Sequence, residues 1–144
     1  MRVLGLDVGD RRIGIAMSDE LELTAQGLMV VERQSPAADV AALQRVIAAH
    51  AIDRIVVGMP RNMDGSYGPQ ATKTTQFMQA LAQACHLPCL PWDERLTTRQ
   101  AERTLMLGNQ RRQKRKAVRD KIAAQLILQN YLDYQRAAPP RPVG

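Results

Sequence analysis

Three strand-like segments follow one another at the start of this 144-residue chain, and their order constrains the fold more than any other feature. Residues 3–8 form a short apolar run, Gly9 and Asp10 signal a turn, and residues 13–18 and 28–31 form two further runs. No helical pattern separates them. Strands joined by short turns pair in antiparallel fashion, so we expect the chain to begin as a three-stranded antiparallel sheet.

Helices and strands alternate in the rest of the chain. Ser35 and Pro36 predict the amino end of a helix, because a serine side chain caps the first turn and proline tolerates its first position. Apolar periodicity and capping residues predict the remaining elements. Helices are expected at residues 36–50, 74–85 and 97–108 and from Asp120 onward, and strands at residues 55–57 and 86–91.

This order of elements predicts an α/β fold, with a mixed five-stranded sheet and helices on both faces. It does not match the strict strand and helix repeat of a dinucleotide-binding fold. We expect one domain over residues 1–136, followed by a proline-rich, disordered tail at 137–144. No apolar stretch reaches the length of a membrane helix, and Asp7 interrupts the apolar run that a signal peptide would need, so the expected location is the cytoplasm.

Two cysteines, Cys85 and Cys89, lie four residues apart beside His86. A structural zinc site usually takes four cysteine or histidine ligands, and this chain has only two residues of each type. We therefore predict two reduced, buried thiols and no zinc site.

Positive charge is concentrated in one segment. The chain has 20 Lys and Arg against 14 Asp and Glu, a formal net charge of +6, which predisposes it toward phosphate-rich partners. Residues 111–119 contain no acid and hold a cluster of basic side chains: Arg111, Arg112, Lys114, Arg115, Lys116 and Arg119. The cluster predicts a nucleic-acid contact, and a solvated loop or helix face is the alternative.

An acidic residue interrupts the first strand. If side chains alternate between the two faces of the sheet, Asp7 shares a face with Val3 and Gly5. A carboxylate in a core strand is costly to desolvate unless a cation or several donors meet it, so metal ligation would explain it economically. The alternative is that Asp7 caps the following turn by accepting hydrogen bonds from backbone amides.

Two further acidic positions could meet Asp7. Glu94 directly follows the fifth strand, at the carboxyl edge where open α/β sheets bind ligands. Its neighbour Asp93 would point elsewhere, and the pattern leaves open which of the two turns toward a common centre, or whether both are surface acids. Asp120 opens the last helix, where small residues three and four positions later would let it approach Gly5 closely; a favourable charge at a helix amino end is the alternative.

Four segments, taken together, resemble one protein family. They comprise Gly5, Leu6, Asp7, Val8 and Gly9 with Arg12, Ile13 and Gly14; Gly58, Met59 and Pro60 with Asn62, Met63, Asp64 and Gly65; residues 93–98; and Asp120 with Ala123, Ala124, Ile127, Leu128, Tyr131 and Leu132. In this order they resemble the YqgF, or RuvX, family: nucleases of bacterial pre-16S ribosomal RNA with a fold like that of the Holliday junction resolvase RuvC. The resemblance covers nearly the whole chain, and one departure is Arg61, where an apolar residue is common.

The resemblance implies a ribonuclease H-like fold with three catalytic carboxylates, Asp7, Glu94 and Asp120, that also hold Mg²⁺ or Mn²⁺. Two such ions would activate a water molecule as the nucleophile and stabilise the leaving oxygen of a phosphodiester hydrolysis. The implied partners are precursor rRNA or branched DNA, together with ribosomal particles and without membrane contact; the oligomeric state is not predicted. The side chains expected to contact nucleic acid are Arg12, Asn62, Arg95 and the six basic residues of segment 111–119.

Two other functions fit parts of the sequence. Residues 7–9, followed by residues 14–16, also resemble the first phosphate loop of actin-like ATPases, but those proteins generally enclose their nucleotide between two related domains. A nucleic-acid-binding factor without catalysis would explain the basic segment equally well. It would not explain three acids, because carboxylates on a phosphate-binding surface weaken binding unless cations neutralise them. Metal-dependent cleavage of RNA, or of a Holliday junction, therefore explains more of the chain.

Overall fold

A computed structural model describes residues 2–60, 68–93 and 112–137, and in the last range it describes the side chains of residues 120–136. The described residues form β1 (Arg2–Val8), β2 (Arg12–Ser18), β3 (Ala25–Glu32), α1 (Pro36–His50), β4 (Ile52–Met59), α2 (Pro69–Cys85), β5 (Cys89–Asp93) and α4 (Arg112–Ala137). The helix predicted at 97–108 and residues 138–144 of the tail predicted at 137–144 lie outside these ranges, and Ala137 is the last residue of α4.

The strands form one mixed sheet in the order β3-β2-β1-β4-β5. β1, β2 and β3 pair antiparallel, as the opening segments of the sequence predict. β4 pairs with β1, and β5 pairs with β4, in parallel. The predicted mixed five-stranded sheet is therefore confirmed, and the carboxyl ends of β1, β4 and β5 lie at one edge of it.

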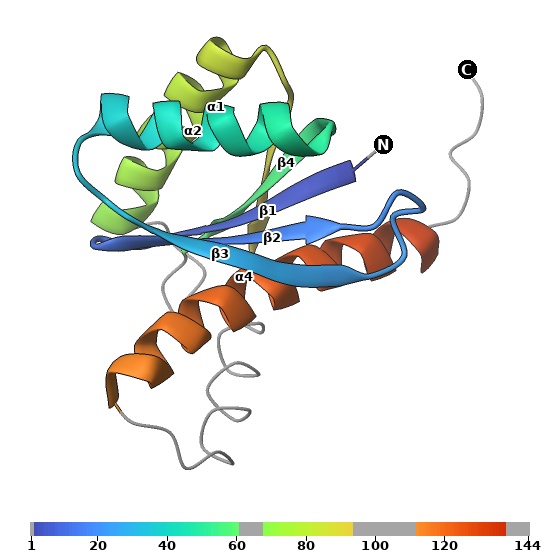
Figure 1. The fold of residues 1–144 in the computed structure, drawn as a ribbon. Coiled ribbons are helices and arrows are strands. Elements are labelled where there is room, and N and C mark those ends of the chain that lie inside the picture. Colours follow the sequence, from blue (N-terminus) through green and yellow to red (C-terminus); the bar gives the residue numbers. More distant parts are fainter. Residues whose placement is uncertain (1, 61–67, 94–111, 138–144) are drawn as a thin grey trace.

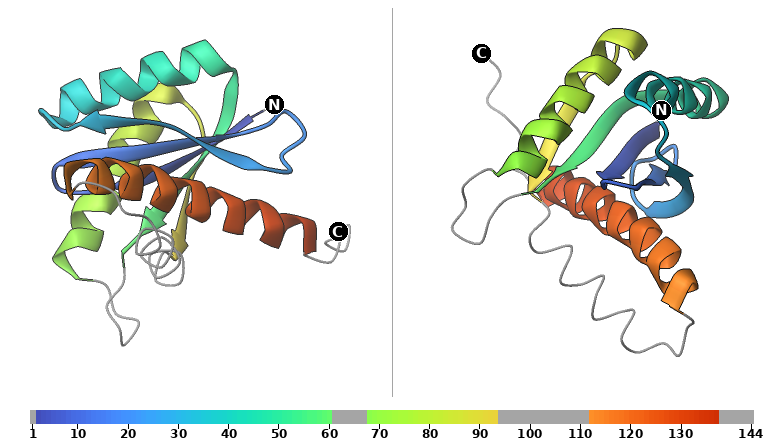
Figure 2. Two further views of the ribbon diagram at one scale, coloured as in Figure 1. Left: turned by 60° about the horizontal axis from the view of Figure 1, so that its bottom comes forward. Right: turned by 90° about the vertical axis from the view of Figure 1, so that its left-hand side faces the viewer.

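Helices cover both faces of the sheet (Figures 1 and 2). α1 and α2 pack on one face, over a core that contains Leu4, Leu6 and Val8, and α4 packs on the other, over Val3 and Val56. Because β1 is buried on both faces, its sequence is almost continuously apolar. None of the described helices is long and apolar enough to span a membrane.

A capping side chain marks the start of α1, and the backbone conformation marks the ends of α1 and α2. The Ser35 side chain accepts a hydrogen bond from the amide of Ala38 at 3.2 Å, and a proline occupies the first turn of α1. Both helices are followed by a residue in the left-handed conformation, Ala51 after α1 and His86 after α2. The predicted end of α1 at His50 is confirmed.

Several element boundaries differ from the expectation: α2 begins at Pro69 rather than at residue 74, and β3 and β4 are longer than the apolar runs that predicted them. α4 begins at Arg112, so Asp120 lies in its third turn rather than at its amino end. Arginine, lysine and glutamine favour helical backbone, so the basic segment extends the helix instead of preceding it. The explanation of Asp120 as a favourable charge at the helix amino end is wrong, because that effect is confined to the first turn. β5 begins at Cys89 rather than at residue 86, because His86 closes α2 by donating its amide to the carbonyl of Ala82.

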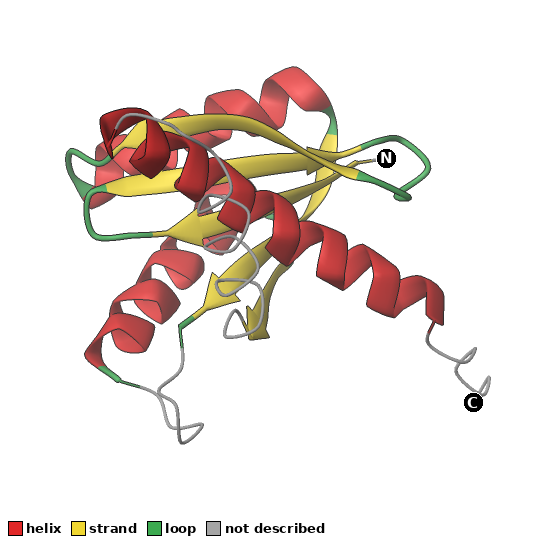
Figure 3. Ribbon diagram, turned by 90° about the horizontal axis from the view of Figure 1, so that it is seen from below, coloured by secondary structure: helices red, strands yellow, loops and turns green. Residues whose placement is uncertain are grey.

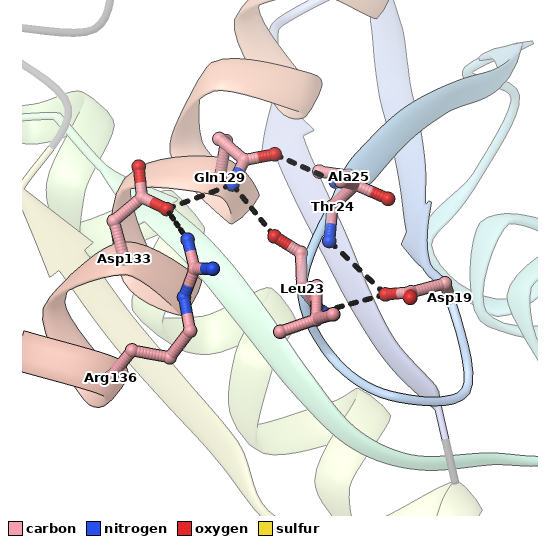
Figure 4. Close-up of polar contacts among 7 residues, drawn as sticks. All are labelled: Asp19, Leu23, Thr24, Ala25, Gln129, Asp133 and Arg136. Atoms are coloured by element: carbon pink, nitrogen blue, oxygen red, sulfur yellow. Dashed lines mark hydrogen bonds and ion pairs between the residues drawn. The ribbon is translucent and has the colours of Figure 1, made fainter.

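The turn between β2 and β3 is fixed to α4 (Figure 4). Asp19 accepts hydrogen bonds from the amides of Leu23 at 2.7 Å and Thr24 at 3.1 Å. Gln129 of α4 accepts from the amide of Ala25 at 2.8 Å and donates to the carbonyl of Leu23 at 3.1 Å. The hydrogen bonds from the amides of Thr24 and Leu23 hold the pKa of the Asp19 carboxyl below its usual value. One charged side chain thus shapes the turn, and one amide side chain joins it to the helix.

We predict that the stabilising effect of Asp19 depends on pH. Because the folded state lowers the pKa of this carboxyl, its contribution is complete above the unfolded value of about 3.9 and is lost as the pH falls through the lower folded value. In urea denaturation, Asp19→Asn should have a lower midpoint than the parent at neutral pH, and the difference should shrink as the pH falls below about 4.

The control for this experiment is Glu20→Gln, which changes a neighbouring, largely exposed side chain. Its urea midpoint should stay close to that of the parent at both neutral and acid pH. If the difference in urea midpoint between Asp19→Asn and the parent were the same at both pH values, the charge of Asp19 would not be what stabilises the turn.

Candidate active site

Asp7 lies one residue before the carboxyl end of β1, on the face covered by α4. It is half-buried, whereas its neighbours Leu6 and Val8 are buried in the core on the other face. Its partner across the pair of β1 and β2 is Gly14. The first predicted acid therefore lies at the edge where the three parallel strands end.

The backbone of α4 rests directly on Gly14. A methyl group at this position would overlap the carbonyl oxygen of Asp120 and lie 2.7 Å from its carbonyl carbon. Because Gly14 is the cross-strand partner of Asp7, Asp120 comes to lie beside Asp7. The structure thus brings together two of the three predicted acids, from opposite ends of the chain.

The expectation that Gly5 admits Asp120 is wrong. A methyl group at Gly5 would lie 2.7 Å from Cβ of Leu128 and 3.2 Å from the carbonyl oxygen of Ala124, both further along α4. Figure 3 shows α4 crossing the sheet obliquely, so that Asp120 meets β2 and Leu128 meets β1. Gly14 belongs to the first family motif. The pairing of β1 with β2 places it opposite Asp7, and this register is the feature that could have identified it from the sequence.

Arg12 places a cation beside the second acid. It begins β2, and its Nη1 lies 3.6 Å from Oδ2 of Asp120. Both side chains are partly exposed, 28% and 27%, so the pair contributes only about 0–1 kcal/mol to stability. The positive charge nevertheless reduces the repulsion between the carboxylates of Asp7 and Asp120. Arg12, predicted as a nucleic-acid contact, therefore lies within the candidate site.

Arg33 braces the turn between β1 and β2. Its Nη1 donates to the carbonyl of Gly9 at 3.0 Å, and its Nε donates to Oδ2 of Asp39 at 3.1 Å. Asp39 is only 2% exposed, and its other oxygen accepts from the amide of Gln34 at 3.0 Å. A buried carboxylate with both oxygens hydrogen-bonded holds the guanidinium in one orientation. The sequence did not reveal this pair, because an acid in the first turn of a helix ordinarily indicates only a favourable charge.

The structure describes Asp93, next to the third predicted acid, but it does not describe that acid, Glu94. Asp93 ends β5 beside Met59 of β4, at the same edge of the sheet as Asp7. In the described part of the chain, no three acidic, cysteine or histidine side chains lie together in a way that could hold a metal ion. Glu94 lies outside the described residues, so its assignment stays a prediction.

The remaining predicted contacts with nucleic acid have no described side chains. Asn62, Arg95 and Arg111 lie outside the described residues. The first turns of α4, where only the backbone is described, carry Arg112, Lys114, Arg115, Lys116 and Arg119. The backbone therefore places these five positions along the helix just before Asp120.

The two cysteines take no part in the site. Both are free thiols, and they are half-buried rather than buried as predicted. Burial, with a smaller contribution from Cys85, raises the pKa of the Cys89 thiol to about 11, and burial also raises the pKa of Cys85. Both groups stay protonated at neutral pH, and a protonated thiol is a poor nucleophile and a poor metal ligand.

Two cavities lie between α2 and the edge formed by β4 and β5, on the face away from Asp7. Their volumes are about 450 and 220 Å³, and they share Met59, Thr75 and Pro91. Their described lining is mostly apolar and contains no charged side chain, so it offers nothing that would bind a phosphate.

Comparison with known sequences identifies relatives over nearly the full length of the chain. Residues 1–134 match the model of the RuvX family, described as "Holliday junction resolvase". A protein of Halothermothrix orenii is 50% identical over 135 residues, which cover 94% of this chain and 96% of the relative. A protein of Symbiobacterium thermophilum is 51% identical over 140 residues, covering 97% of each chain. Both relatives are named "Putative pre-16S rRNA nuclease".

Solved structures share the fold. RuvC of Thermus thermophilus in complex with a Holliday junction substrate superposes with a TM-score of 0.62 at 16% identity, covering 97% of this chain and 99% of RuvC. The fowlpox virus resolvase, in complex with Holliday junction DNA, gives a TM-score of 0.59 at 11% identity, covering 94% of this chain and 99% of the resolvase. The fold is therefore ribonuclease H-like, as predicted.

We predict that Gly14→Ala displaces Asp120 and destabilises the fold. The added methyl group would overlap backbone atoms of α4, which cannot rotate away as a side chain can, so the helix must lift from the sheet. We expect the free energy of unfolding in urea to fall by roughly 1–3 kcal/mol or more, which is typical of overpacking.

Gly27→Ala is the matched control for this change. Gly27 lies on β3 under the same helix, but a methyl group there would lie 3.4 Å from Cβ of Lys121, an ordinary contact distance. It should leave the free energy of unfolding within about 0.5 kcal/mol of that of the parent. An equal loss of unfolding free energy in the two variants would show that α4 lies no closer to Gly14 than to Gly27.

Proposed function

We propose that this chain, which belongs to the RuvX family, is a metal-dependent nuclease that hydrolyses phosphodiester bonds of precursor 16S rRNA in the cytoplasm, during ribosome biogenesis. One observation carries the proposal: the backbone of Asp120 rests on Gly14, the strand partner of Asp7. This contact brings two acids from distant parts of the sequence to one edge of a ribonuclease H-like sheet. The identity of about 50% to relatives named for pre-16S rRNA supports the choice of substrate.

The donor set at this edge suits a divalent cation. Two neighbouring carboxylates and one guanidinium, those of Asp7, Asp120 and Arg12, have a formal charge that sums to −1 before Glu94 is counted. Carboxylate oxygens are the ligands that Mg²⁺ and Mn²⁺ prefer. We propose that Asp7, Glu94 and Asp120 hold the metal. When bound, the metal supplies activation of the attacking water and charge stabilisation at the leaving oxygen.

The other residues of the site orient these acids. Arg33 fixes the turn that follows Asp7, through the carbonyl of Gly9. Arg12 keeps a positive charge next to Asp120, where it can also contact a phosphate of the substrate. Holding the acids in place before the substrate arrives removes the need to reorganise charge during the reaction.

We propose that the basic first turns of α4 bind the nucleic-acid backbone and position it next to the acids. Arg112 precedes Asp120 by eight residues, a distance of roughly 12 Å along a helix, so the basic residues extend from the site along one axis. Asn62, Arg95 and Arg111 are proposed to contribute further phosphate contacts. Contacts of this kind position a nucleic acid without reading its sequence.

A DNA junction is the second candidate substrate. The family model carries the description of a Holliday junction resolvase, and the fold is shared with two resolvases. Incubating the purified chain and Mg²⁺ with the end of a precursor 16S rRNA and, separately, with a four-way DNA junction would decide between them. Cleavage of the junction but not of the RNA would replace the proposed substrate, and cleavage of neither would favour a binding factor without catalysis.

We predict that Asp7→Asn, Glu94→Gln and Asp120→Asn each lower the rate of cleavage by roughly two orders of magnitude or more, because each removes a charged ligand from one shared centre. Combining two of these changes should cost little more than one, since the acids act as a unit. EDTA should abolish cleavage, and added Mg²⁺ or Mn²⁺ should restore it. Rates are measured as turnover of a labelled substrate.

Asp133→Asn is the control for these variants, because it makes the same chemical change on the same helix at an exposed position. It should cleave like the parent. An active Glu94→Gln with an inactive Asp93→Asn would move the third ligand to Asp93, and full activity in excess EDTA would exclude the metal mechanism.

We predict that changing Arg111, Arg112, Lys114 and Arg115 to Gln weakens binding to all sequences alike, because phosphate contacts carry no base information. The slope of log affinity against log salt should fall by about 0.7 to 0.9 for each phosphate that is no longer bound, so by roughly three if all four residues touch phosphates. Binding is measured by fluorescence anisotropy across a series of salt concentrations, with EDTA present so that the substrate stays intact.

Arg45→Gln with Lys73→Gln is the control, because both residues are exposed on α1 and α2, on the opposite face of the sheet. This double variant lowers the net charge without touching α4, so its salt slope should stay near that of the parent. A quadruple variant with unchanged affinity and slope would show that the first turns of α4 are only a solvated surface.

A further inference from the structure

Three of the five aromatic residues of the chain form one cluster on the α4 face. The chain contains one Trp, three Tyr and one Phe. The ring of Trp92, on β5, lies 5.6 Å from that of Tyr131 at an interplanar angle of 89°, and 5.4 Å from that of Tyr134 at 66°. Both tyrosines belong to α4. Edge-to-face packing of this kind gives the rings a defined mutual geometry.

The inner part of the cluster is fixed and the outer part faces solvent. Tyr131 is 3% exposed, and its hydroxyl accepts a hydrogen bond from Nη1 of Arg54 at 3.0 Å. Tyr134 is 60% exposed, which is unusual for so large a ring on a face that is otherwise packed. Trp92 is half-buried between the two environments. The exposed ring of Tyr134, which packs edge-on against Trp92, is therefore available for stacking.

The register of the sheet places the cluster beside the candidate active site. Leu6 pairs with Val57, and Gly58 pairs with Trp92, so Asp7, the position of Gly58 and Trp92 form one row across β1, β4 and β5. Trp92 packs in the same core as residues under α4, the face to which Asp7 belongs. Two strand spacings separate β5 from β1, about 10 Å. The residue between the two has no side chain to divide them.

The basic residues, Asp120 and the two tyrosines follow one another along α4. Along α4, the basic first turns precede Asp120, and Tyr131 and Tyr134 follow it, Tyr134 by 14 residues or roughly 21 Å. Figure 3 shows the helix passing obliquely over the sheet. A nucleic-acid strand that enters over the basic turns and passes the acids would therefore reach the aromatic cluster next.

We propose that Trp92 and Tyr134 form a stacking surface for unpaired bases, so that the strand leaving the acids is bound single-stranded. The proposal rests on the proposed nuclease function and names the class of its substrate. An aromatic ring stacks on any base, because every base has a π-face, and it does so only when the base is free of its own duplex neighbours. A regular duplex would leave the cluster unused.

The only tryptophan of the chain reports directly on this surface. The full chain, in EDTA to prevent hydrolysis, is titrated with a single-stranded oligouridylate and with an RNA duplex of equal length, while tryptophan emission and the anisotropy of the labelled RNA are recorded. We expect the single strand to quench the emission of Trp92 in a saturable manner. The duplex should bind through its phosphates without that quenching.

Tyr134→Leu and Tyr134→Phe separate stacking from packing. Leucine keeps an apolar side chain but removes the ring, and phenylalanine keeps the ring. We expect Tyr134→Leu to weaken binding of the single strand about fivefold or more and to leave the duplex affinity unchanged, whereas Tyr134→Phe should bind both RNAs like the parent. Because Tyr134 is largely exposed, the thermal unfolding midpoint of each variant should stay close to that of the parent.

Several outcomes would overturn the proposal. Binding of the single strand without quenching, or an equal drop in affinity for both RNAs in Tyr134→Leu, would show that the cluster only packs α4 onto β5. Concentration-dependent quenching without RNA, abolished in Tyr134→Leu, would show that a second copy covers the cluster. In each of these cases RNA binding and cleavage would stand. No binding of any RNA by anisotropy would instead remove the proposed function along with the stacking surface.

Discussion

The contact between α4 and three glycines of the sheet is the constraint on which the site depends. Adjacent strands β1, β2 and β3 each place one glycine beneath the helix, at Gly5, Gly14 and Gly27. A glycine weakens a strand, since it packs nothing and loses more entropy on folding. Here the missing side chains let the helix backbone approach closely enough for Asp120 to lie beside Asp7. The same approach buries an apolar stripe of the helix that includes Ile127, Leu128 and Leu132.

The apolar contact between α4 and the sheet also offsets the charge repulsion within the site. Two neighbouring carboxylates repel each other, and a partly exposed ion pair such as Arg12 with Asp120 offsets only a fraction of that repulsion. The rest of the stabilisation comes from elements away from the acids. These are the core under α4, the junction of Gln129 with the β2–β3 turn, and the brace from Arg33 to the carbonyl of Gly9. The fold thus tolerates charge repulsion at one edge because hydrophobic burial and hydrogen bonds hold the same elements elsewhere.

Residues whose placement depends on local pattern could be predicted from the sequence, and those that depend on tertiary register could not. Alternation along β1 gave the face of Asp7 correctly, and the capping serine and the apolar spacing gave the two ends of α1. The glycine that admits Asp120 was misassigned to Gly5, because the crossing angle of a helix over a sheet leaves no trace in either segment alone. The start of α4 was misplaced for a different reason: basic residues suit both a helix and a solvated loop. The three acidic positions could be named as candidates from the family motifs, whereas the contact that places Asp120 beside Asp7 could not.

The candidate acids and the aromatic cluster belong to different parts of the sheet, and this bears on how one fold could serve different substrates. RuvC shares the architecture at 16% identity, so the arrangement of sheet and helices survives the replacement of most side chains. In this chain the positions of Asp7 and Asp120 depend on β1, β2 and the third turn of α4, whereas the aromatic cluster depends on β5 and the carboxyl-terminal turns of α4. The sheet register brings the two positions close in space, with Gly58 between them, while Tyr134 lies at the exposed outer end of the cluster. A change at Tyr134, which is largely exposed, therefore leaves the contact that brings Asp7 and Asp120 together undisturbed, and under the stacking proposal it would alter which nucleic acid is bound.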